Sequence, residues 1–242
     1  MSPRARLADQ GFIRFPAEQT LAMLGGEAAA DWSAFAASWN DLGLDTFMAD
    51  GGRYRRRRFA AFAVGPGLLA RKPHQPHWQS RDYNPLNGGV QRWFEPVSDA
   101  IADHAVTRGV IAMGLDLFDP LSPASDTPWH VEMHQFRIEA RAGEQGLPTP
   151  EGMHRDGVDW VIVMLVDRQN VDSGVTDIFA PDGASLGSFT LTAPGDAVLL
   201  DDHRVLHGVT PIRPRDESAP AVRDVLVVTF RREESTQTES AT

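Results

Sequence analysis

Two histidines and one carboxylate are the residues whose types and spacing most directly predict chemistry in this chain. His154 and Asp156 stand two residues apart, before a long apolar run, and His207 follows within a later apolar stretch. If His154 and Asp156 lie on a strand, both side chains point to the same side of it. Two imidazoles and a carboxylate form the facial triad that holds Fe(II) in non-haem oxygenases. The pattern therefore predicts a metal centre of His154, Asp156 and His207.

Such a triad leaves three adjacent positions of an octahedral iron open, so that a 2-oxo acid chelates two of them and O2 takes the third. An H-x-D pair alone arises often by chance, and the later histidine gives the pattern its weight. His203 competes with His207, because residues four apart on a strand share a face. We favour His207, which lies in an apolar stretch, over His203, which follows Asp201 and Asp202 in an expected turn.

The composition narrows the possible classes of protein. The chain has 242 residues, of which 42% are hydrophobic, and this suits one domain with a sizeable core. Cysteine is absent, which excludes disulfides, thiolate metal sites and a cysteine nucleophile. Any metal must therefore bind nitrogen and oxygen ligands, as iron does in a site of carboxylate and imidazole groups.

The charge and hydropathy patterns bear on partners and location. A net charge of −10 argues against a protein that follows a nucleic-acid backbone, because such proteins usually carry a basic surface. The N-terminus lacks the apolar core of a signal peptide, and no apolar run is long enough to cross a bilayer. We expect a cytoplasmic protein that binds neither nucleic acid nor membrane and acts on a small molecule. The sequence does not predict an oligomeric state.

The first half of the chain mixes helices with few strands. Apolar periodicity predicts helices at residues 4–8, 17–24, 27–40 and 96–113, and strands at 11–15 and 54–64. The strand at 54–64 opens with consecutive arginines. They either form a solvated strand edge, or one of them turns inward to bind a substrate carboxylate.

Residues 71–89 are rich in proline and glycine and predict a long loop that forms a lid or a substrate wall. Within it, His74 and His77 lack a nearby carboxylate or cysteine at ligand spacing. We expect them to be surface-loop residues.

The second half reads almost wholly as β-structure. Strands are expected at residues 129–140, 160–166, 175–179, 186–191, 197–200 and 223–230, joined by glycine and proline turns. This pattern predicts a mainly β protein with flanking helices and a double-stranded β-helix, the jelly-roll or cupin-like core. We expect one domain over 1–232, with 1–128 as helical and loop support and 129–232 as the β-helix core. The polar residues 233–242 predict a disordered tail.

The strand at 129–140 has two possible phases. If His134, Phe136 and Ile138 face the outer core, Gln135 and Arg137 look into the barrel as candidate substrate contacts. The opposite phase, which turns Gln135 and Arg137 away from the interior, is also compatible with the alternation.

Several spaced motifs together resemble a known family. They are residues 54–59, 83–85, 148–152, the His154 and Asp156-Gly157 pair, Asp201-Asp202, His207-Gly208 and residues 223–226. The chain resembles the bacterial 2-oxoglutarate/Fe(II)-dependent dioxygenases of the L-isoleucine 4-hydroxylase type over residues 54–230. The resemblance implies a double-stranded β-helix and the use of Fe(II), 2-oxoglutarate and O2. It also implies hydroxylation of an aliphatic carbon in a free or N-substituted L-amino acid or a similar small carboxylate, with release of succinate and CO2.

The resemblance also suggests roles for individual residues. His154, Asp156 and His207 match the iron ligands, and Arg223 matches the arginine that pairs with the far carboxylate of 2-oxoglutarate. An inward arginine in an apolar strand needs an anionic partner, although Arg223 could instead lie at a wet strand end or pair with Asp224. Arg213 and Arg231 are weaker alternatives for this role.

Residues 172–176 depart from the family pattern, which has a glycine pair followed by an acidic residue. Thr176 is therefore a candidate substrate contact, and the departure makes substrate identity less transferable. Two alternatives to the enzyme remain in view, namely a non-catalytic barrel that binds a metal or small molecule, and a nucleic-acid demethylase. The complete triad favours the dioxygenase.

Overall fold

The computed structural model describes residues 1–232, and the expected disordered tail at 233–242 lies outside the described residues. The helices are α1 (Pro3–Gln10), α2 (Ala17–Leu24), α3 (Gly26–Ala30), α4 (Trp32–Ala37), η1 (Ser38–Asp41), α5 (Asp99–Ala102), α6 (Ala105–Phe118) and η2 (Asp119–Leu121). The strands are β1 (Phe12–Phe15), β2 (Arg55–Gly65), β3 (Leu68–Arg71), β4 (Trp129–Ala140), β5 (Trp160–Gln169), β6 (Val171–Ser173), β7 (Thr176–Phe179), β8 (Ser185–Phe189), β9 (Ala197–Asp201), β10 (Leu206–Val209), β11 (Ile212–Pro214) and β12 (Ala221–Arg232).

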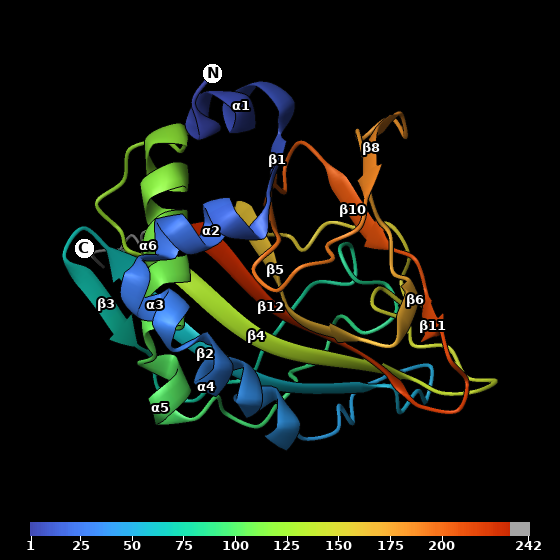
Figure 1. Ribbon diagram of the computed structural model, residues 1–242. Coiled ribbons are helices and arrows are strands. Elements are labelled where there is room, and N and C mark those ends of the chain that lie inside the picture. The colour runs from blue at the N-terminus through green and yellow to red at the C-terminus, as the bar shows by residue number, and fades with distance from the viewer. Residues whose placement is uncertain (233–242) are drawn as a thin grey trace, which may run out of the picture.

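One large antiparallel sheet forms the frame of the molecule. Its seven strands run in the order β1-β9-β5-β12-β4-β2-β3, and the long strands β4, β5 and β12 cross its centre (Figure 1). A three-stranded sheet, β10-β7-β8, and a two-stranded sheet, β11-β6, complete the β-structure. The expected mainly β architecture with a jelly-roll core is confirmed.

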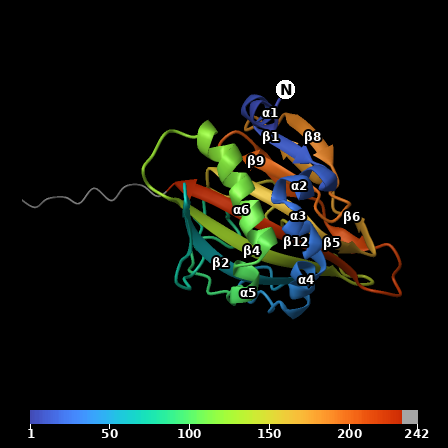
Figure 2. The same cartoon turned by 60° about the vertical axis from the view of Figure 1, so that its left-hand side comes forward.

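The helices cover one face of the large sheet, with α6 lying across its strands (Figures 1 and 2). The main apolar core lies at this interface. It contains Val110 and Phe118 of α6 together with Met133, Ile162 and Phe230 of the sheet. Because side chains alternate along a strand, the intervening residues of β4, β5 and β12 face the other way. That other face lines the cavity described below.

Two expected helices are each divided in the structure. The expected helix at 27–40 becomes α3, α4 and η1, and the break falls at Asp31, whose carboxylate lies 3.0 Å from Nε2 of His104. The expected helix at 96–113 is divided because His104 caps a new one, its Nδ1 accepting a hydrogen bond from the backbone N–H of Val106. Side-chain capping of this kind competes with helix continuation.

The expected division of the chain at residue 128 does not coincide with a layer boundary. Strands β1, β2 and β3 all precede residue 128, yet they belong to the same large sheet as β4, β5, β9 and β12. Strand β5, which contains the apolar run at 160–166, is covered on both faces, because Ile162 packs on the helices and Val161 packs on the opposite side. No helix within residues 1–232 has the length and apolar character needed to span a membrane.

Candidate active site

A cavity of about 240 Å³ lies against the inner face of the large sheet. Alternate residues of β12 and β4 form its floor, while β10 and the loop before β5 lie over it. Residues 77–84 add another wall, as expected for the long proline-rich loop. At Gly157, a side chain would collide with the ring of Tyr83, and the backbone has a positive φ of 78°. Glycine therefore allows this loop to close on the cavity.

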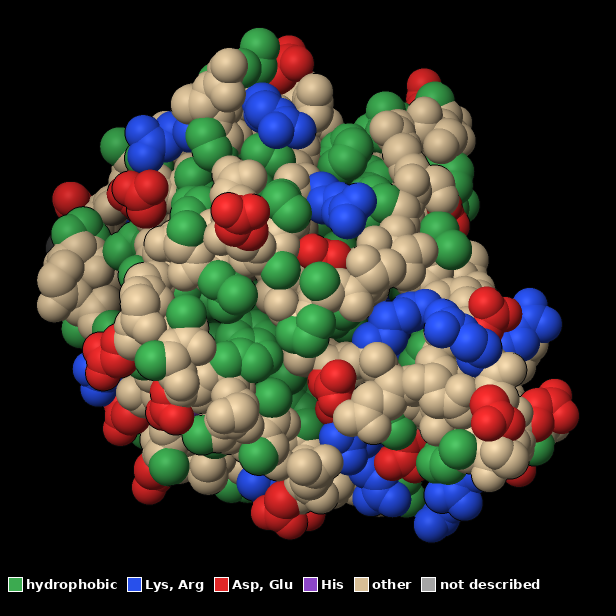
Figure 3. Space-filling model, in the orientation of Figure 1, with side chains coloured by type: hydrophobic (Ala, Val, Ile, Leu, Met, Phe, Trp, Pro, Cys, Tyr) green, Lys and Arg blue, Asp and Glu red, His purple; other side chains and the backbone are tan. Residues whose placement is uncertain are grey.

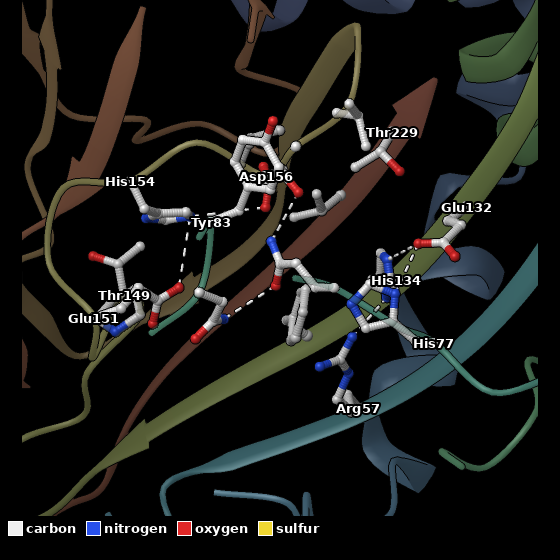
Figure 4. Close-up of a pocket in the computed structure, with 18 of the residues that line it drawn as sticks. Arg57, His77, Tyr83, Glu132, His134, Thr149, Glu151, His154, Asp156 and Thr229 are labelled. Atoms are coloured by element: carbon white, nitrogen blue, oxygen red, sulfur yellow. Dashed lines mark hydrogen bonds and ion pairs between the residues drawn. The ribbon is translucent and has the colours of Figure 1, made fainter. Parts of the chain in front are cut away.

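The structure brings His154, Asp156 and His207 together at this cavity. Their ligand atoms lie within 4.8 Å of one another, and Figure 4 shows His154 and Asp156 directed to the same side of the cavity. Nε2 of His154 is 3.8 Å from Oδ1 of Asp156, and Nε2 of His207 is 3.6 Å from Oδ2. His154 and His207 also pair through reciprocal backbone hydrogen bonds of 3.0 Å. His154 and Asp156 were expected on a regular strand, but in the structure His154 forms only an isolated β-bridge with His207.

The protonation pattern of the two imidazoles suits a metal. Nδ1 of His154 donates to the backbone oxygen of Gly152 at 3.0 Å, which leaves Nε2 as the nitrogen that can bind a metal. Burial lowers the pKa of His154, but Asp156 and Glu151 together raise it above its ordinary value. Burial and the neighbouring His154 lower the pKa of His207 to about 3. His207 is thus neutral at neutral pH, as a metal ligand must be.

Asp202 fixes the loop that carries Asp156. Its Oδ1 accepts from the backbone N–H of Asp156 at 2.9 Å, and its Oδ2 accepts from Gly157 at 2.7 Å and Val158 at 3.1 Å. Burial and the proximity of Asp156 raise the pKa of Asp202. In the sequence, Asp202 is recognisable only as part of an expected turn. Its position beside the apolar strand β9 gave no indication that it would hold a distant loop.

His203 lies away from the triad. Its side chain is 68% exposed, and Nε2 is 2.9 Å from Oδ1 of Asp159. This agrees with the expectation that His203 is a turn residue.

Arg223 is a buried cation without a carboxylate partner in residues 1–232. It is 2% exposed, lines the cavity, and has no hydrogen-bond partner at Nε or Nη2. Burial and the nearby Arg168 lower its pKa to about 10, so it remains charged at neutral pH. Asp224, the alternative partner, points to the other face of β12 and pairs with Arg137 at 2.7 Å. The site therefore fits an incoming carboxylate.

Gln135, Arg137 and Thr176 do not line the cavity. The second of the two possible phases of β4 is the observed one, because Phe136 and Ile138 face inward. Gln135 instead donates from Nε2 to Oγ of Ser38 at 2.8 Å on the helical side. Arg137 is held by Asp224, and Thr176 is buried where β7 pairs with β10. The inward orientation of Gln135 and Arg137 was wrong because the helices cover the face of β4 that carries Val131 and Met133, which is also the face of Gln135 and Arg137.

The basic run at the start of β2 turns two arginines inward. Arg55 and Arg57 are 6% and 4% exposed and line the cavity. Both lie next to the buried Asp45, whose Oδ2 is 2.8 Å from Nη2 of Arg55 and 3.7 Å from Nη1 of Arg57. The run is therefore more than a solvated strand edge. Its alternate members Arg56 and Arg58 pair with Glu139 and Asp41.

A second polar cluster, His77, Glu132 and His134, lies on the other side of the cavity from His154 (Figure 4). His77 was expected to be a surface-loop residue, but its Nδ1 is 2.8 Å from Oε2 of Glu132 and its side chain is only 13% exposed. His74, in contrast, packs edge-on against the ring of Trp93. The polar residues at alternate positions 130, 132 and 134 of β4 are the signal that could have predicted this inward polar face.

The hydrogen bonds of the second cluster make it a poorer metal site than the first. Arg57 can only donate, and its Nη2 lies 2.7 Å from Nδ1 of His134, so this nitrogen accepts. Nε2 of His134 then carries the proton and faces Glu132 at 3.5 Å. A metal would have to displace that proton and break the contact with Arg57, whereas in the triad Nε2 of both histidines already faces the carboxylate of Asp156. Of the two clusters, the triad fits Fe(II) better.

Comparisons with known proteins agree with this chemistry. A family model described as 2OG-Fe dioxygenase matches residues 36–229. The 3(1)-hydroxy-L-isoleucine 4-dioxygenase of Pantoea ananatis is 25% identical over 171 residues, which cover 69% of this chain and 68% of that protein. The L-isoleucine-4-hydroxylase of Bacillus thuringiensis is 24% identical over 160 residues, 66% of each chain. A crystal structure of a bsmA homologue from Methylobium petroleophilum PM1 is 38% identical, with a TM-score of 0.86, and the match covers 95% of this chain and 91% of that one.

Proposed function

Because the chain belongs to the 2OG-Fe dioxygenase family, we propose that it hydroxylates an aliphatic carbon of a free or N-substituted L-amino acid or a similar small carboxylate metabolite. It is an oxidoreductase that depends on Fe(II), 2-oxoglutarate and O2. When bound, these three supply the oxidant for inserting one oxygen atom into a C–H bond, with release of succinate and CO2. The proposal rests mainly on one observation, that the triad of His154, Asp156 and His207 lines the same cavity as Arg223, a buried arginine without a carboxylate partner in residues 1–232.

We assign Fe(II) to His154, Asp156 and His207. The lone pair on Nε2 of His154 and the neutral imidazole of His207 are the properties that support this assignment. Asp202 acts as a positioning residue, because three backbone hydrogen bonds to its carboxylate fix the loop that carries Asp156. The three ligands need little rearrangement to close on an ion.

We assign the far carboxylate of 2-oxoglutarate to Arg223. Its unpartnered nitrogens and the lack of a salt bridge to Asp224 support this role over a structural one. A guanidinium can donate two parallel hydrogen bonds to a carboxylate. The two parallel bonds would orient the cosubstrate while its other end reaches the iron.

A small substrate suits the dimensions and charge of the molecule. The cavity, at about 240 Å³, is below the usual range of about 300–1,000 Å³ for ligand pockets. The net charge is −10, and on the face drawn in Figure 3 basic side chains lie among acidic ones. These features favour a metabolite over a nucleic acid. The two curated relatives act on isoleucine or its hydroxylated derivative, which supports an amino acid.

A substrate screen tests the proposal. The iron-loaded protein is incubated in air with 2-oxoglutarate and each of the twenty amino acids, their N-acyl derivatives, cyclic imino acids and methylated oligonucleotides. We expect substrate-dependent succinate release and a mass gain of one oxygen in an amino acid or N-acyl amino acid. Turnover of oligonucleotides alone would contradict the proposed substrate class.

A further inference from the structure

Arg92 is a second buried cation that lacks an anionic partner in residues 1–232. Its side chain is almost fully buried and lines the cavity. The one hydrogen bond of its guanidinium is a long one, from Nη2 to Oε1 of Gln79 at 3.4 Å, and Nε has no partner. An isolated buried charge costs several kcal/mol unless it is paired. An anionic ligand in the cavity would compensate for the buried charge of Arg92.

The neighbouring carboxylate of Asp45 is already engaged. Its Oδ2 accepts from Nε of Arg55 at 2.8 Å and lies near Arg57, while Oδ1 accepts from the backbone N–H of Phe47. Three guanidinium groups, those of Arg55, Arg57 and Arg92, share this region with two acids, Asp45 and Glu132, whose charges act on Arg57 and Arg92. Glu132 is itself engaged with His77, so this wall of the cavity keeps one positive charge in excess, which a substrate carboxylate would balance.

Glu151 is a buried carboxylate that lacks a lysine or arginine partner within residues 1–232. It lies at the end of the cavity that contains His154. Its side chain is 8% exposed, and Oε2 is buried without a hydrogen-bond partner in the described chain. Its Oε1 lies 3.6 Å from Nε2 of His154, and no lysine or arginine within residues 1–232 is in salt-bridge contact with it. Figure 4 shows Glu151 directed toward His154 and the cavity. A buried carboxylate oxygen in this state calls for a donor from the ligand.

Arg92 and Glu151 face one cavity without touching each other. They form no salt bridge, yet the charge of Glu151 helps to raise the pKa of Arg92, which burial and Arg55 lower. Two buried charges of opposite sign that line one cavity match a ligand that carries both charges on groups attached to one carbon. The ammonium and carboxylate of an α-amino acid have this arrangement.

We propose that Arg92 binds the carboxylate and Glu151 the ammonium of a free α-amino acid substrate. The inference rests on the function proposed above and narrows it, because N-acyl amino acids lack the cation and simple amines lack the anion. Arg223 remains available for 2-oxoglutarate, since its charged neighbour is Arg168 rather than Asp45 or Glu151.

Anaerobic binding measures this directly, without turnover. The weak visible charge-transfer band of the protein with Fe(II) and 2-oxoglutarate is recorded while L-isoleucine, L-leucine, L-valine or L-methionine is added. N-acetyl-L-isoleucine and 2-methylbutylamine serve as probes that lack one charge each. We expect at least one free amino acid to shift the band, with both single-charge probes at least about 30-fold weaker.

Variants assign the two charges. Arg92→Gln should weaken amino-acid binding by at least about 30-fold, and Arg92→Lys by less, because lysine keeps the charge but not the paired hydrogen bonds. Arg81→Gln is the matched control, since Arg81 is an exposed arginine of the neighbouring loop. Glu151→Gln should lower the ratio of the affinity for the free amino acid to the affinity for its N-acetyl derivative. Retention of the band in each variant shows that the protein is folded and holds both cofactors.

These measurements distinguish failure of the proposed amino-acid recognition by Arg92 and Glu151 from failure of the proposed dioxygenase function. Unchanged amino-acid affinity in Arg92→Gln, or equal affinity of the wild type for the N-acetyl derivative, overturns the proposed recognition pair. Loss of iron from Glu151→Gln, with no change in amino-acid preference, would place Glu151 in the metal site instead and also overturn it. If the wild type forms no band with Fe(II) and 2-oxoglutarate, the proposed function itself fails.

Discussion

Replacement of Asp202 by asparagine should weaken iron binding although Asp202 is not a proposed ligand. The carboxylate accepts three backbone hydrogen bonds of 2.7–3.1 Å from Asp156, Gly157 and Val158. An asparagine amide has one accepting oxygen, so the best orientation keeps the two bonds to Gly157 and Val158. Its NH2 group then faces the N–H of Asp156, and a donor meets a donor. The loop that carries Asp156 loses one hydrogen bond to a charged acceptor.

The expected magnitude follows from that single loss. A hydrogen bond to a charged group contributes about 1.5–3 kcal/mol, and relief of the repulsion between Asp202 and Asp156 offsets a part of it. Each 1.4 kcal/mol corresponds to a factor of ten, so Asp202→Asn should bind Fe(II) about 10- to 150-fold more weakly. This range agrees with the usual effect of groups that orient metal ligands, about 10- to 100-fold.

The assay is an anaerobic competition titration of Fe(II), with urea unfolding of the metal-free proteins to separate local from global effects. Asp201→Asn is the matched control, because Asp201 lies next in sequence and its Oδ1 accepts from the backbone N–H of His203 rather than from the metal loop. Wild-type iron affinity in Asp202→Asn, or an equal loss in Asp201→Asn, would refute the positioning role.

Three further predictions concern single residues. His207→Ala should abolish iron binding, while His203→Ala keeps most of it because that side chain is 68% exposed; the reverse in metal analysis would exchange their roles. Arg223→Gln should raise the 2-oxoglutarate requirement by roughly 1.5 to 3.5 decades, or about 2–5 kcal/mol, and the iron requirement much less; equal changes in both titrations would count against it. Burial lowers the pKa of His134 from 6.5 to about 3, so the unfolded chain takes up a proton first as the pH falls below 6.5. Stability should therefore decline between those pH values, by about 2 kcal/mol at pH 5. Urea unfolding should show this loss reduced in His134→Gln, and an identical pH dependence would contradict the assignment.

Local patterns were sufficient to predict most strands and the residues of the triad. The alternation and apolar content of residues 129–140 and 160–166 correspond to β4 and β5, because periodicity reports directly which residues are buried. The single carboxylate two positions after His154, and the later His207, do lie together in space. An arginine within the last apolar strand, Arg223, is buried and faces inward, as its apolar neighbours indicated.

The remainder depends on contacts between segments far apart in the sequence. Which residues of β4 face the cavity depends on which face of the strand the helices cover, and the local sequence pattern does not predict that. Arg92 lies in an irregular segment and Glu151 in a turn, so neither belongs to a periodic pattern that reveals its burial. The role of Asp45 as a buried partner of Arg55 and Arg57 becomes visible only when β2 is placed beside it. The breaks at Asp31 and His104 likewise arise from a contact between two helical segments.

We propose that the triad and Arg223 together hold Fe(II) and 2-oxoglutarate in one cavity. The most direct test is anaerobic titration of the metal-free protein with Fe(II) in the presence of 2-oxoglutarate. We predict a weak visible charge-transfer band that saturates at one iron per chain, disappears in His154→Ala, and needs much more 2-oxoglutarate in Arg223→Gln. Absence of the band from the wild type, or its persistence in His154→Ala, would show that this cavity does not hold Fe(II) and 2-oxoglutarate as proposed.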